Sequence, residues 1–286
     1  MAQFNLKAYL STRKEWVEKA LFELLPTPED TPDILVGAMR HALLAGGKRL
    51  RPILCLAAAE GVGKPCEPVM PAACAVELLH NYTLVHDDLP CMDNDVERRG
   101  SPSVWKQFGE GIGVLAGDAL LTLAFGVLVR TPEIRPGIQA RLVHELSLAA
   151  GACGVIGGQV EDIAYDGHPT RDQIDYVFQH KTADLFRAAC RLGAVASDAS
   201  DANLTRISSF ANHLGFAFQI QDDLLDAGNA RKDERPELSC LDLMSAEEAT
   251  AWASRETEAA VAALADLPGY VEPLRALAES LQNRKF

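Results

Sequence analysis

The sequence predicts an all-α protein folded as a helical bundle. Hydrophobic residues make up 48% of the 286-residue chain, alanine and leucine dominate it, and alternating β-branched stretches are scarce. Apolar residues instead recur at the spacing of an amphipathic helix. A chain of this length and apolar content can bury a large core, and nothing in its middle resembles a linker. We therefore expect residues 1–286 to form a single domain.

Helical spacing is clearest in segments that are separated by proline, glycine and small polar residues. The apolar repeats cover 38–59, 70–85, 114–129 and 138–150, and a further repeat ends at Asp226. The intervening composition predicts breaks at 26–32, 61–68, 131–136, 199–202 and 227–236.

The composition also limits the class of function. A formal net charge of −13 disfavours a nucleic-acid binder, because such proteins need a basic face to displace counterions. The N-terminus lacks an apolar stretch of signal-peptide length, and the most apolar later stretch is interrupted by Asp118. We therefore expect a cytoplasmic protein without a transmembrane segment. Seven scattered cysteines without a CxxC pair favour reduced thiols over disulfides or a zinc site.

The first acidic cluster, HDDLPCMDND, places Asp87, Asp88 and Asp93 at the end of an apolar helical segment. The helix dipole disfavours carboxylates at a helix C-terminus, and buried carboxylates need a cation to neutralise them. On a continuous helix Asp93 would lie about 120° from Asp87. Pro90 ends or bends the helix, so both carboxylates can face one ion. Taken alone, this cluster is equally consistent with a solvated helix end.

The second acidic cluster, QIQDDLLD, is tighter than the first. An amide and three carboxylates fall on one helical stripe at i, i+3, i+4 and i+7, namely Gln219, Asp222, Asp223 and Asp226. Two such clusters facing each other without ions would repel by about 4 kcal/mol per pair at about 4 Å and an effective dielectric of about 20. Oxygen ligands favour Mg²⁺, with Mn²⁺ as an alternative, and a ligand that carries phosphates. Two unrelated acidic patches are the competing interpretation.

Two basic groups, GGKRLRP at 46–52 and ERRG at 97–100, are notable in so acidic a chain. Arginine binds phosphate oxygens in a bidentate manner, and lysine adds a mobile charge, so these groups could hold a diphosphate. Either group alone is more simply a solvated turn. The GxxxxGK[ST] loop, the GxGxxG fingerprint, the nucleophile elbow and the HExxH pair are all missing from the sequence.

In this order the motifs resemble those of the trans-isoprenyl diphosphate synthases, or polyprenyl synthetases. The resemblance covers residues 35–264 and rests on GGKRLRP, ELLHNYTLVHDDLPCMDND, RRG, AGDALL at 116–121, GGQVEDI at 157–163, HKT at 180–182 and FQIQDDLLD. It implies an isoprenoid-synthase-type helical bundle around a central cavity. The two aspartate-rich motifs would face each other at its mouth, usually in a homodimer.

The resemblance also implies a role for individual residues. The Mg²⁺ ligands would be Asp87, Asp88, Asp93, Asp222, Asp223 and Asp226. Isopentenyl diphosphate would be held by Lys48, Arg51, His80 and Arg99. The allylic diphosphate and the catalytic step would involve Arg98, Lys181, Thr182 and Gln219, while Gln159 and Asp162 match the GQxxD motif.

The implied reaction is a head-to-tail condensation of isopentenyl diphosphate with dimethylallyl or geranyl diphosphate. Metal ions and Arg98 would stabilise the departing diphosphate, and the isopentenyl double bond would attack the allylic cation. Tyr82 and Thr83, just before Asp87, correspond to cavity-floor positions that limit product length. A tyrosine there resembles bacterial farnesyl diphosphate synthases, so we expect a C15 product. A C20 product, with Tyr82 merely packed in the core, is the alternative.

The sequence departs from the family pattern in two places. Relatives commonly carry a longer segment after the second motif that ends in a lysine, whereas 227–240 is short and has Glu237 near that position. SPSVW at 101–105 replaces the more usual KPTxH.

Three other functions compete with prenyl elongation. A terpene cyclase needs no second diphosphate site, so the second set of cations argues against it. Intact acidic motifs argue against a noncatalytic modulator subunit of another synthase. A purely structural bundle would leave the six carboxylates unexplained.

Overall fold

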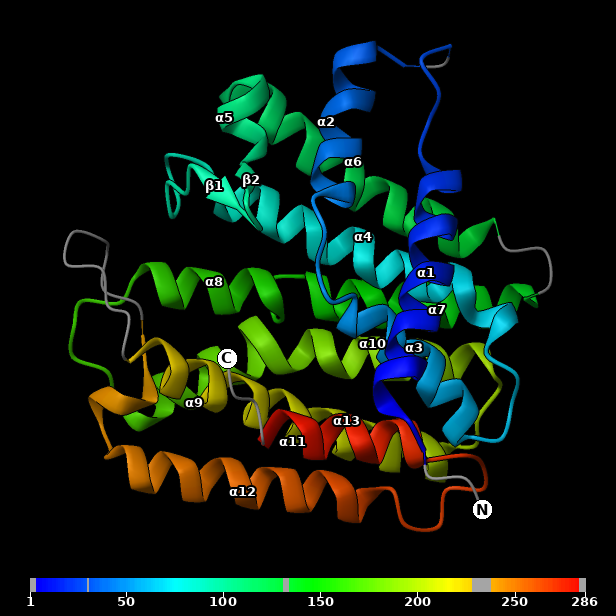
Figure 1. Ribbon diagram of the computed structural model, residues 1–286, viewed down its shortest axis with the longest axis vertical. Helices are drawn as coiled ribbons and strands as arrows, with labels where there is room; N and C mark the ends of the chain where they lie inside the picture. The colour runs from blue at the N-terminus through cyan, green and yellow to red at the C-terminus, as the bar shows by residue number, and fades with distance from the viewer. Residues whose placement is uncertain (1–3, 30, 131–133, 228–237, 283–286) are drawn as a thin grey trace.

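The computed structural model is an all-α bundle, as the sequence predicts, and describes residues 4–29, 31–130, 134–227 and 238–282 (Figure 1). Its α-helices are α1 (Leu6–Leu24), α2 (Asp33–Leu44), α3 (Leu50–Gly61), α4 (Met70–Asp87), α5 (Val104–Phe108), α6 (Glu110–Val129), α7 (Pro136–Ala150), α8 (Val155–Ile163), α9 (Arg171–Val177), α10 (Asp184–Ala196), α11 (Asp201–Asp226), α12 (Ala246–Ala263) and α13 (Glu272–Gln282). Short 3₁₀ turns, η1 (Glu67–Val69) and η3 (Cys240–Asp242), and a π-helical turn, η2 (Phe178–Ala183), complete the helical elements.

A small antiparallel hairpin follows α4. It consists of β1 (Glu97–Arg98) and β2 (Ser101–Pro102), with Arg98 opposite Ser101. The hairpin lies beside α5 at one end of the bundle (Figure 1). The shortened segment at residues 228–237, including Glu237, lies outside the described residues.

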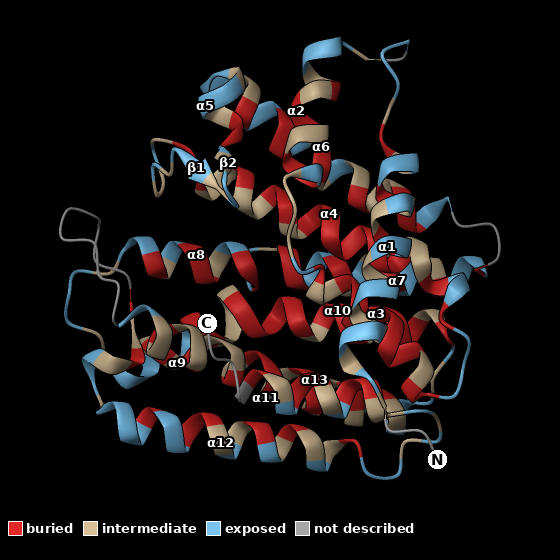
Figure 2. Ribbon diagram, viewed as in Figure 1, coloured by how far each residue is buried: buried red, intermediate tan, exposed pale blue. Residues whose placement is uncertain are grey.

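Helix α10 occupies the centre of the bundle, where it contacts α3, α4, α7 and α11. Figure 2 shows buried residues along α3, α4 and α10, whereas the outer side of α12 is exposed. The main apolar core runs from Val17 in α1 to Leu281 in α13. A second cluster packs α9, η2, α11 and α12 around Phe178 and Trp252, whose rings stack at 5.8 Å between centroids.

The predicted helices at 70–85, 114–129 and 138–150 correspond to α4, α6 and α7. The apolar repeat at 38–59 instead belongs to two helices, because the chain turns between α2 and α3. Gly46 and Gly47 adopt positive φ angles of 95° and 119°, and Arg49 follows with 51°. These left-handed conformations cannot continue a helix, and glycine adopts them at little steric cost.

All seven cysteines are free thiols, as the sequence predicts. Cys55, Cys66, Cys74, Cys190 and Cys240 are buried, whereas Cys91 and Cys153 are exposed.

Within the described ranges, α6 is long and apolar enough to cross a membrane by length and composition, with a mean hydropathy of 2.2. In the bundle α6 packs against α2, α4, α5 and α7. The core helix of a water-soluble protein meets the same criterion, so the composition of α6 does not indicate a membrane span.

Candidate active site

A cavity of about 560 Å³ lies among α4, α8, η2, α10 and α11. These segments are distant in sequence but adjacent in the bundle (Figure 1). The lining residues are Arg51, His80, Tyr82, Thr83, Leu84, His86, Asp87, Met92, Val155, Ile156, Gln159, Val160, Ile163, Lys181, Thr182, Leu185, Phe218, Gln219 and Asp222. Its polar groups therefore come from both acidic motifs and from the HKT motif, and α8 supplies a largely apolar wall.

One carboxylate from each acidic motif lines the cavity, Asp87 from the end of α4 and Asp222 from α11. The chain turns back after α4, and the Asp93 backbone N–H donates to the Asp87 carbonyl oxygen at 2.9 Å. Burial raises the pKa of Asp87 to about 7; nearby Lys181 opposes the shift, and Asp93 adds to it. The turn predicted at Pro90 thus brings Asp93 back beside Asp87.

Asp88 lies away from this cavity. It accepts a hydrogen bond from Arg98 Nε at 2.8 Å and lines a separate cavity of about 20 Å³ with Arg98 and Arg99. Successive side chains on a helix point about 100° apart, so Asp87 and Asp88 point to different sides of the end of α4. Arg98 also pairs with Asp95.

Asp223 and Asp226 also differ from Asp222. Asp223 is buried and accepts from the Cys240 backbone N–H at 2.7 Å, Ser239 Oγ at 3.0 Å and Gln219 Nε2 at 3.0 Å. It therefore connects the end of α11 to η3. Asp226 is exposed at the last position of α11 and is not part of the cavity lining.

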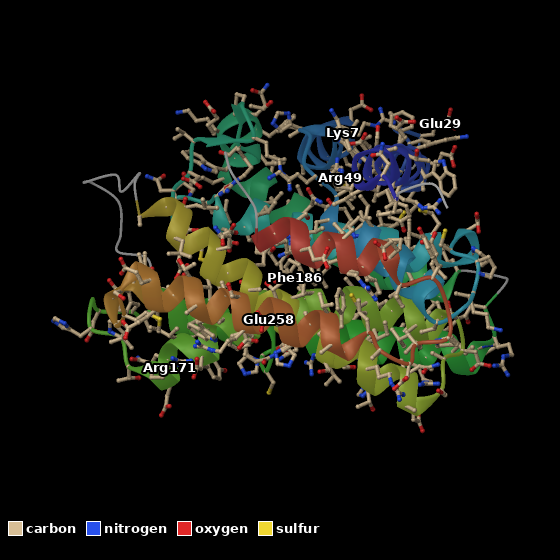
Figure 3. The ribbon with its side chains drawn as sticks, turned by 60° about the horizontal axis from the view of Figure 1, so that its bottom comes forward. Lys7, Glu29, Arg49, Arg171, Phe186 and Glu258 are labelled. Carbon is tan, nitrogen blue, oxygen red and sulfur yellow. The ribbon has the colours of Figure 1, made fainter. Side chains whose placement is uncertain are left out.

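A cluster of arginines surrounds His80. Burial lowers the pKa of His80 well below its usual value, and Arg51 and Arg99 lower it further. His80 Nε2 lies 3.3 Å from Arg51 Nη1, and the Arg51 guanidinium lies 4.9 Å from the ring centroid of Phe186, labelled in Figure 3. Burial also lowers the pKa of Arg51 to about 10. This concentration of positive charge around a neutral imidazole suits an anionic ligand.

The remaining predicted cations come from the two turns. Lys48 is exposed in the loop between α2 and α3. Arg99 Nη1 donates to the Gly46 carbonyl oxygen at 2.8 Å, so the hairpin and this loop are in contact. Only Arg51 and His80 of the predicted isopentenyl diphosphate set line the large cavity.

The π-helical turn η2 presents Lys181 and Thr182 to the cavity. Lys181 Nζ donates to Asp162 Oδ2 at 2.7 Å, and Thr182 Oγ1 donates to Gln219 Oε1 at 2.7 Å. Burial opposes the charge on Lys181, but attraction from Asp162, Asp87 and Asp93 outweighs it and raises the pKa of Lys181. Lys181 thus lies within the field of the first acidic motif. Turns of π-helix are often found at functional sites.

The predicted cavity-floor residues, Tyr82 and Thr83, both line the cavity. Tyr82 is 8% exposed, and Thr83 Oγ1 donates to the His80 carbonyl oxygen at 2.8 Å. Tyr82 precedes Asp87 by five positions, which is about 7.5 Å along a helix axis.

The acidic residues fit a hydrated divalent cation better than a preformed metal cage. No group of three His, Cys, Asp or Glu side chains among the described residues is arranged to hold a metal by itself. Mg²⁺ typically uses one or two carboxylates and completes its octahedron with water and phosphate oxygens. Asp87, Asp93 and Asp222 offer such oxygen donors, and burial, with a smaller contribution from Asp93, raises the pKa of Asp87, so its charged form lacks full compensation without a cation.

Some contributors to this site were not predicted. His86 lines the cavity between Tyr82 and Asp87, and its four-residue spacing from Tyr82 could have identified it. Asp184, 2% exposed, accepts hydrogen bonds at the end of the π turn from Gln179, His180 and Arg187. Arg49, also 2% exposed, pairs with buried Glu77 at 2.8 Å below the basic loop. Arg49 belongs to the basic group at 46–52, but nothing in the sequence indicates that it is buried, and no local signal distinguishes Asp184 from a surface charge.

Comparison with known proteins identifies the family. The polyprenyl synthetase family model matches residues 32–245. A farnesyl diphosphate synthase from Geobacillus stearothermophilus is 40% identical over 235 residues, covering 81% of this chain and 79% of the relative. The large subunit 1 of a heterodimeric geranylgeranyl pyrophosphate synthase from Arabidopsis thaliana is 44% identical over 239 residues, covering 81% of this chain but only 64% of the relative.

Solved structures agree over nearly the whole chain. The apo crystal structure of an FPP/GFPP synthase from Zymomonas mobilis has a TM-score of 0.90 and 35% identity, covering 97% of this chain and 99% of that one. A geranylgeranyl pyrophosphate synthetase from Pyrococcus horikoshii has a TM-score of 0.86 and 29% identity, with 98% of both chains covered. The chain therefore belongs to the polyprenyl synthetase family.

Proposed function

We propose that this protein condenses isopentenyl diphosphate with dimethylallyl diphosphate and then with geranyl diphosphate, and releases farnesyl diphosphate (C15). The observation that carries the proposal is that Asp87, Asp222 and the arginine-flanked His80 line one cavity, with Tyr82 beneath the first motif. The carboxylates suit a metal-bound diphosphate, and the cationic cluster suits a second diphosphate.

The chain's own groups account for binding and orientation. Mg²⁺ held by Asp87, Asp93 and Asp222 would supply Lewis-acid neutralisation of the leaving diphosphate. Lys181 adds a positive charge beside the first motif, where its pKa is raised, and can stabilise negative charge on that diphosphate. The Thr182 and Gln219 oxygens, joined by their 2.7 Å hydrogen bond, lie on the cavity wall and can stabilise an allylic cation.

The apolar wall of the cavity has a separate role. Val155, Ile156, Val160 and Ile163 of α8 line the cavity together with Phe218. Apolar side chains exclude water, which would otherwise capture a carbocation. They also accommodate a growing hydrocarbon chain through burial of apolar surface.

A C20 product is the second candidate, because the similar relatives include both farnesyl and geranylgeranyl synthases. The residue that favours C15 is Tyr82, whose ring occupies the cavity wall below Asp87. Product length therefore tests the finer assignment, whereas extension of any primer tests the elongase activity.

The decisive experiment incubates the purified protein with Mg²⁺, labelled isopentenyl diphosphate and, separately, C5, C10 and C15 primers. We expect extension of the C5 and C10 primers to C15, loss of activity with EDTA, and recovery with Mg²⁺. Predominant C20 product would overturn the role assigned to Tyr82. Failure to extend every primer would overturn the elongase proposal and favour a modulator subunit.

Substitution of Tyr82 tests the chain-length role directly. Tyr82→Ala opens space below Asp87, so we expect the C20 to C15 product ratio to rise by about tenfold or more. Tyr82→Phe keeps the ring and serves as the matched control, with a ratio close to that of the wild type. If the Tyr82→Ala variant is active and its C20 to C15 product ratio is unchanged, Tyr82 is a packed core residue that does not limit product length.

We also propose that residues 1–286 form one domain that assembles as a cytoplasmic homodimer. The main apolar core spans the chain from α1 to α13, which supports one domain. The outer face of α6 leaves Val114, Leu115 and Val129 at 41–55% exposed, and Leu148 of adjacent α7 is 51% exposed. Exposed apolar side chains on neighbouring helices support an interface between subunits, in which Asp118 and Thr122 would lie between the apolar residues of α6.

A further inference from the structure

The AGDALL motif of α6 has no part in the function proposed so far. Its glycine, Gly117, is buried in the middle of the helix. Glycine in a helix interior costs roughly 1 kcal/mol relative to alanine. A close neighbour that excludes a Cβ would explain a glycine at this position.

That neighbour is His86 of α4. A Cβ on Gly117 would lie 2.1 Å from His86 Nε2 and 2.3 Å from its Cδ2, well inside van der Waals contact. The imidazole therefore rests directly against the α6 backbone, and its Nε2–H donates to the Val114 carbonyl oxygen at 3.0 Å. Among the other α6 glycines, a Cβ on Gly111 or Gly126 would meet no atom within 4 Å, and one on Gly113 would meet only contacts beyond 3.0 Å.

The His86 ring also contacts the ring of Tyr82. The two rings are one helical turn apart on α4, with centroids 5.1 Å apart and an interplanar angle of 80°. Both residues line the large cavity. His86 thus contacts both the α6 backbone and the tyrosine that we propose as the limit to product length, and the edge-to-face contact restricts the orientation of both rings.

We propose that Gly117 and His86 are specificity-determining positioning residues: Gly117 provides the space that seats His86 on α6, and His86 in turn fixes the ring of Tyr82 in the cavity wall. This inference rests on the proposed chain-length role of Tyr82. It assigns the AGDALL glycine to product length, through two side-chain contacts, rather than to metal or diphosphate binding.

The two residues have opposite expected effects. His86→Ala removes the ring that restrains Tyr82, so the C20 to C15 ratio should rise about tenfold. Gly117→Ala forces the imidazole off α6 and into the cavity beside Tyr82, so C10 product should accumulate at the expense of C15. Gly126→Ala makes the same change in the same helix without a close neighbour and should keep the wild-type product distribution.

The double variant Gly117→Ala/His86→Ala isolates the contact. Without the imidazole the added methyl group meets no clash, so the double variant should show the product distribution of His86→Ala and should fold even if Gly117→Ala does not. Product lengths are measured by chromatography of labelled products, with melting temperature and molar mass recorded for each variant, including Gly126→Ala.

Two outcomes would overturn the inference. Active single variants with wild-type product ratios would show that the contact does not set product length. If Gly117→Ala changes the product distribution equally with and without His86, the effect arises within α6 and does not act through His86. A wild-type protein that extends no primer would instead overturn the proposed function, and the chain-length role with it.

Discussion

Asp87 lies where the α4 dipole, burial and the nearby Asp93 all disfavour a negative charge. Its pKa of about 7 means that the metal-free protein carries a partly protonated carboxyl group at neutral pH. A cation that binds there must displace this proton. Magnesium affinity should therefore increase as the pH rises through 7.

The same shift makes a prediction about stability. The pKa of Asp87 is about 3.8 in an unfolded chain and about 7 in the fold, so the folded state binds one more proton between these values. The free energy of unfolding therefore falls as the pH rises from about 4 to 7, because Asp87 loses its proton in the fold. In metal-free protein at pH 8, Asp87→Asn should raise the free energy of unfolding by on the order of 2 kcal/mol relative to wild type.

Urea denaturation followed by circular dichroism at pH 4.5 and pH 8 measures this difference. The gain from Asp87→Asn should shrink at the lower pH, because wild-type Asp87 is then protonated in the fold. Asp226→Asn, at an exposed position, is the control. Equal gains at both pH values would contradict the assigned pKa.

The aspartates of the second motif should differ in their contribution to turnover. Asp222 lines the cavity, whereas Asp226 is exposed outside it. We expect Asp222→Ala to lower kcat by about 100-fold or more through lost charge stabilisation, with the fold intact. Asp226→Ala should have a smaller effect. Steady-state kinetics at saturating Mg²⁺ tests this order, and comparable losses would place both carboxylates at the metal.

At the scale of elements, the π turn η2 is held at its C-terminal end by one buried carboxylate. Asp184 accepts from His180 Nδ1 at 2.8 Å, Gln179 Nε2 at 2.9 Å and Arg187 Nη2 at 2.8 Å. These contacts surround the segment that carries Lys181 and Thr182. The geometry of the turn therefore depends on a residue that does not itself line the cavity.

Removal of this carboxylate should affect both stability and catalysis. Asp184→Ala removes the acceptor of His180 and Arg187 and one of the two acceptors of Gln179, which also donates to Asn212. We expect a loss of about 3 kcal/mol in the free energy of unfolding. If the turn positions Lys181 and Thr182, kcat should also fall about tenfold at temperatures where the variant is folded. Asp172→Ala, exposed in the first turn of α9, is the control. A stable variant with wild-type kcat would refute this role.

The long, largely apolar helices α4, α6 and α7 were predictable from the sequence, as was the turn that returns Asp93 to Asp87. Periodicity could not find the break between α2 and α3, because it registers apolar spacing and is insensitive to the positive φ angles at Gly46 and Gly47. It also could not separate Asp87 from Asp88, because their different partners depend on how α4 is rotated within the bundle.

At the scale of the whole molecule, long-range partners were the least predictable part of the site. Asp223 is the clearest case, because its donors Ser239 and Cys240 come from beyond a segment whose path no local pattern specifies. Ordered motifs nevertheless identified the family and the cavity, since seven weak matches in one order are jointly specific. The homodimer was expected only from the family resemblance, and the sequence analysis predicted no residue of an interface.

The proposed dimer gives a prediction at this scale. Leu115 of α6 is 55% exposed, and a charge buried at an apolar interface is strongly unfavourable. Leu115→Glu should therefore convert a dimer into monomers in multi-angle light scattering. Leu243→Glu changes a leucine that is 45% exposed near η3 and should leave the mass unchanged. A wild-type monomer at micromolar concentration would contradict the proposal.

The two exposed thiols adjoin segments that line the cavity. Cys91 immediately precedes the lining residue Met92, and Cys153 lies shortly before the lining residue Val155 at the start of α8. The other five cysteines are buried, so the native chain already carries one addressable position beside each of these two segments. Paired spin labels at these positions would report, by dipolar spectroscopy, whether α8 and the first acidic motif change their separation when a diphosphate binds.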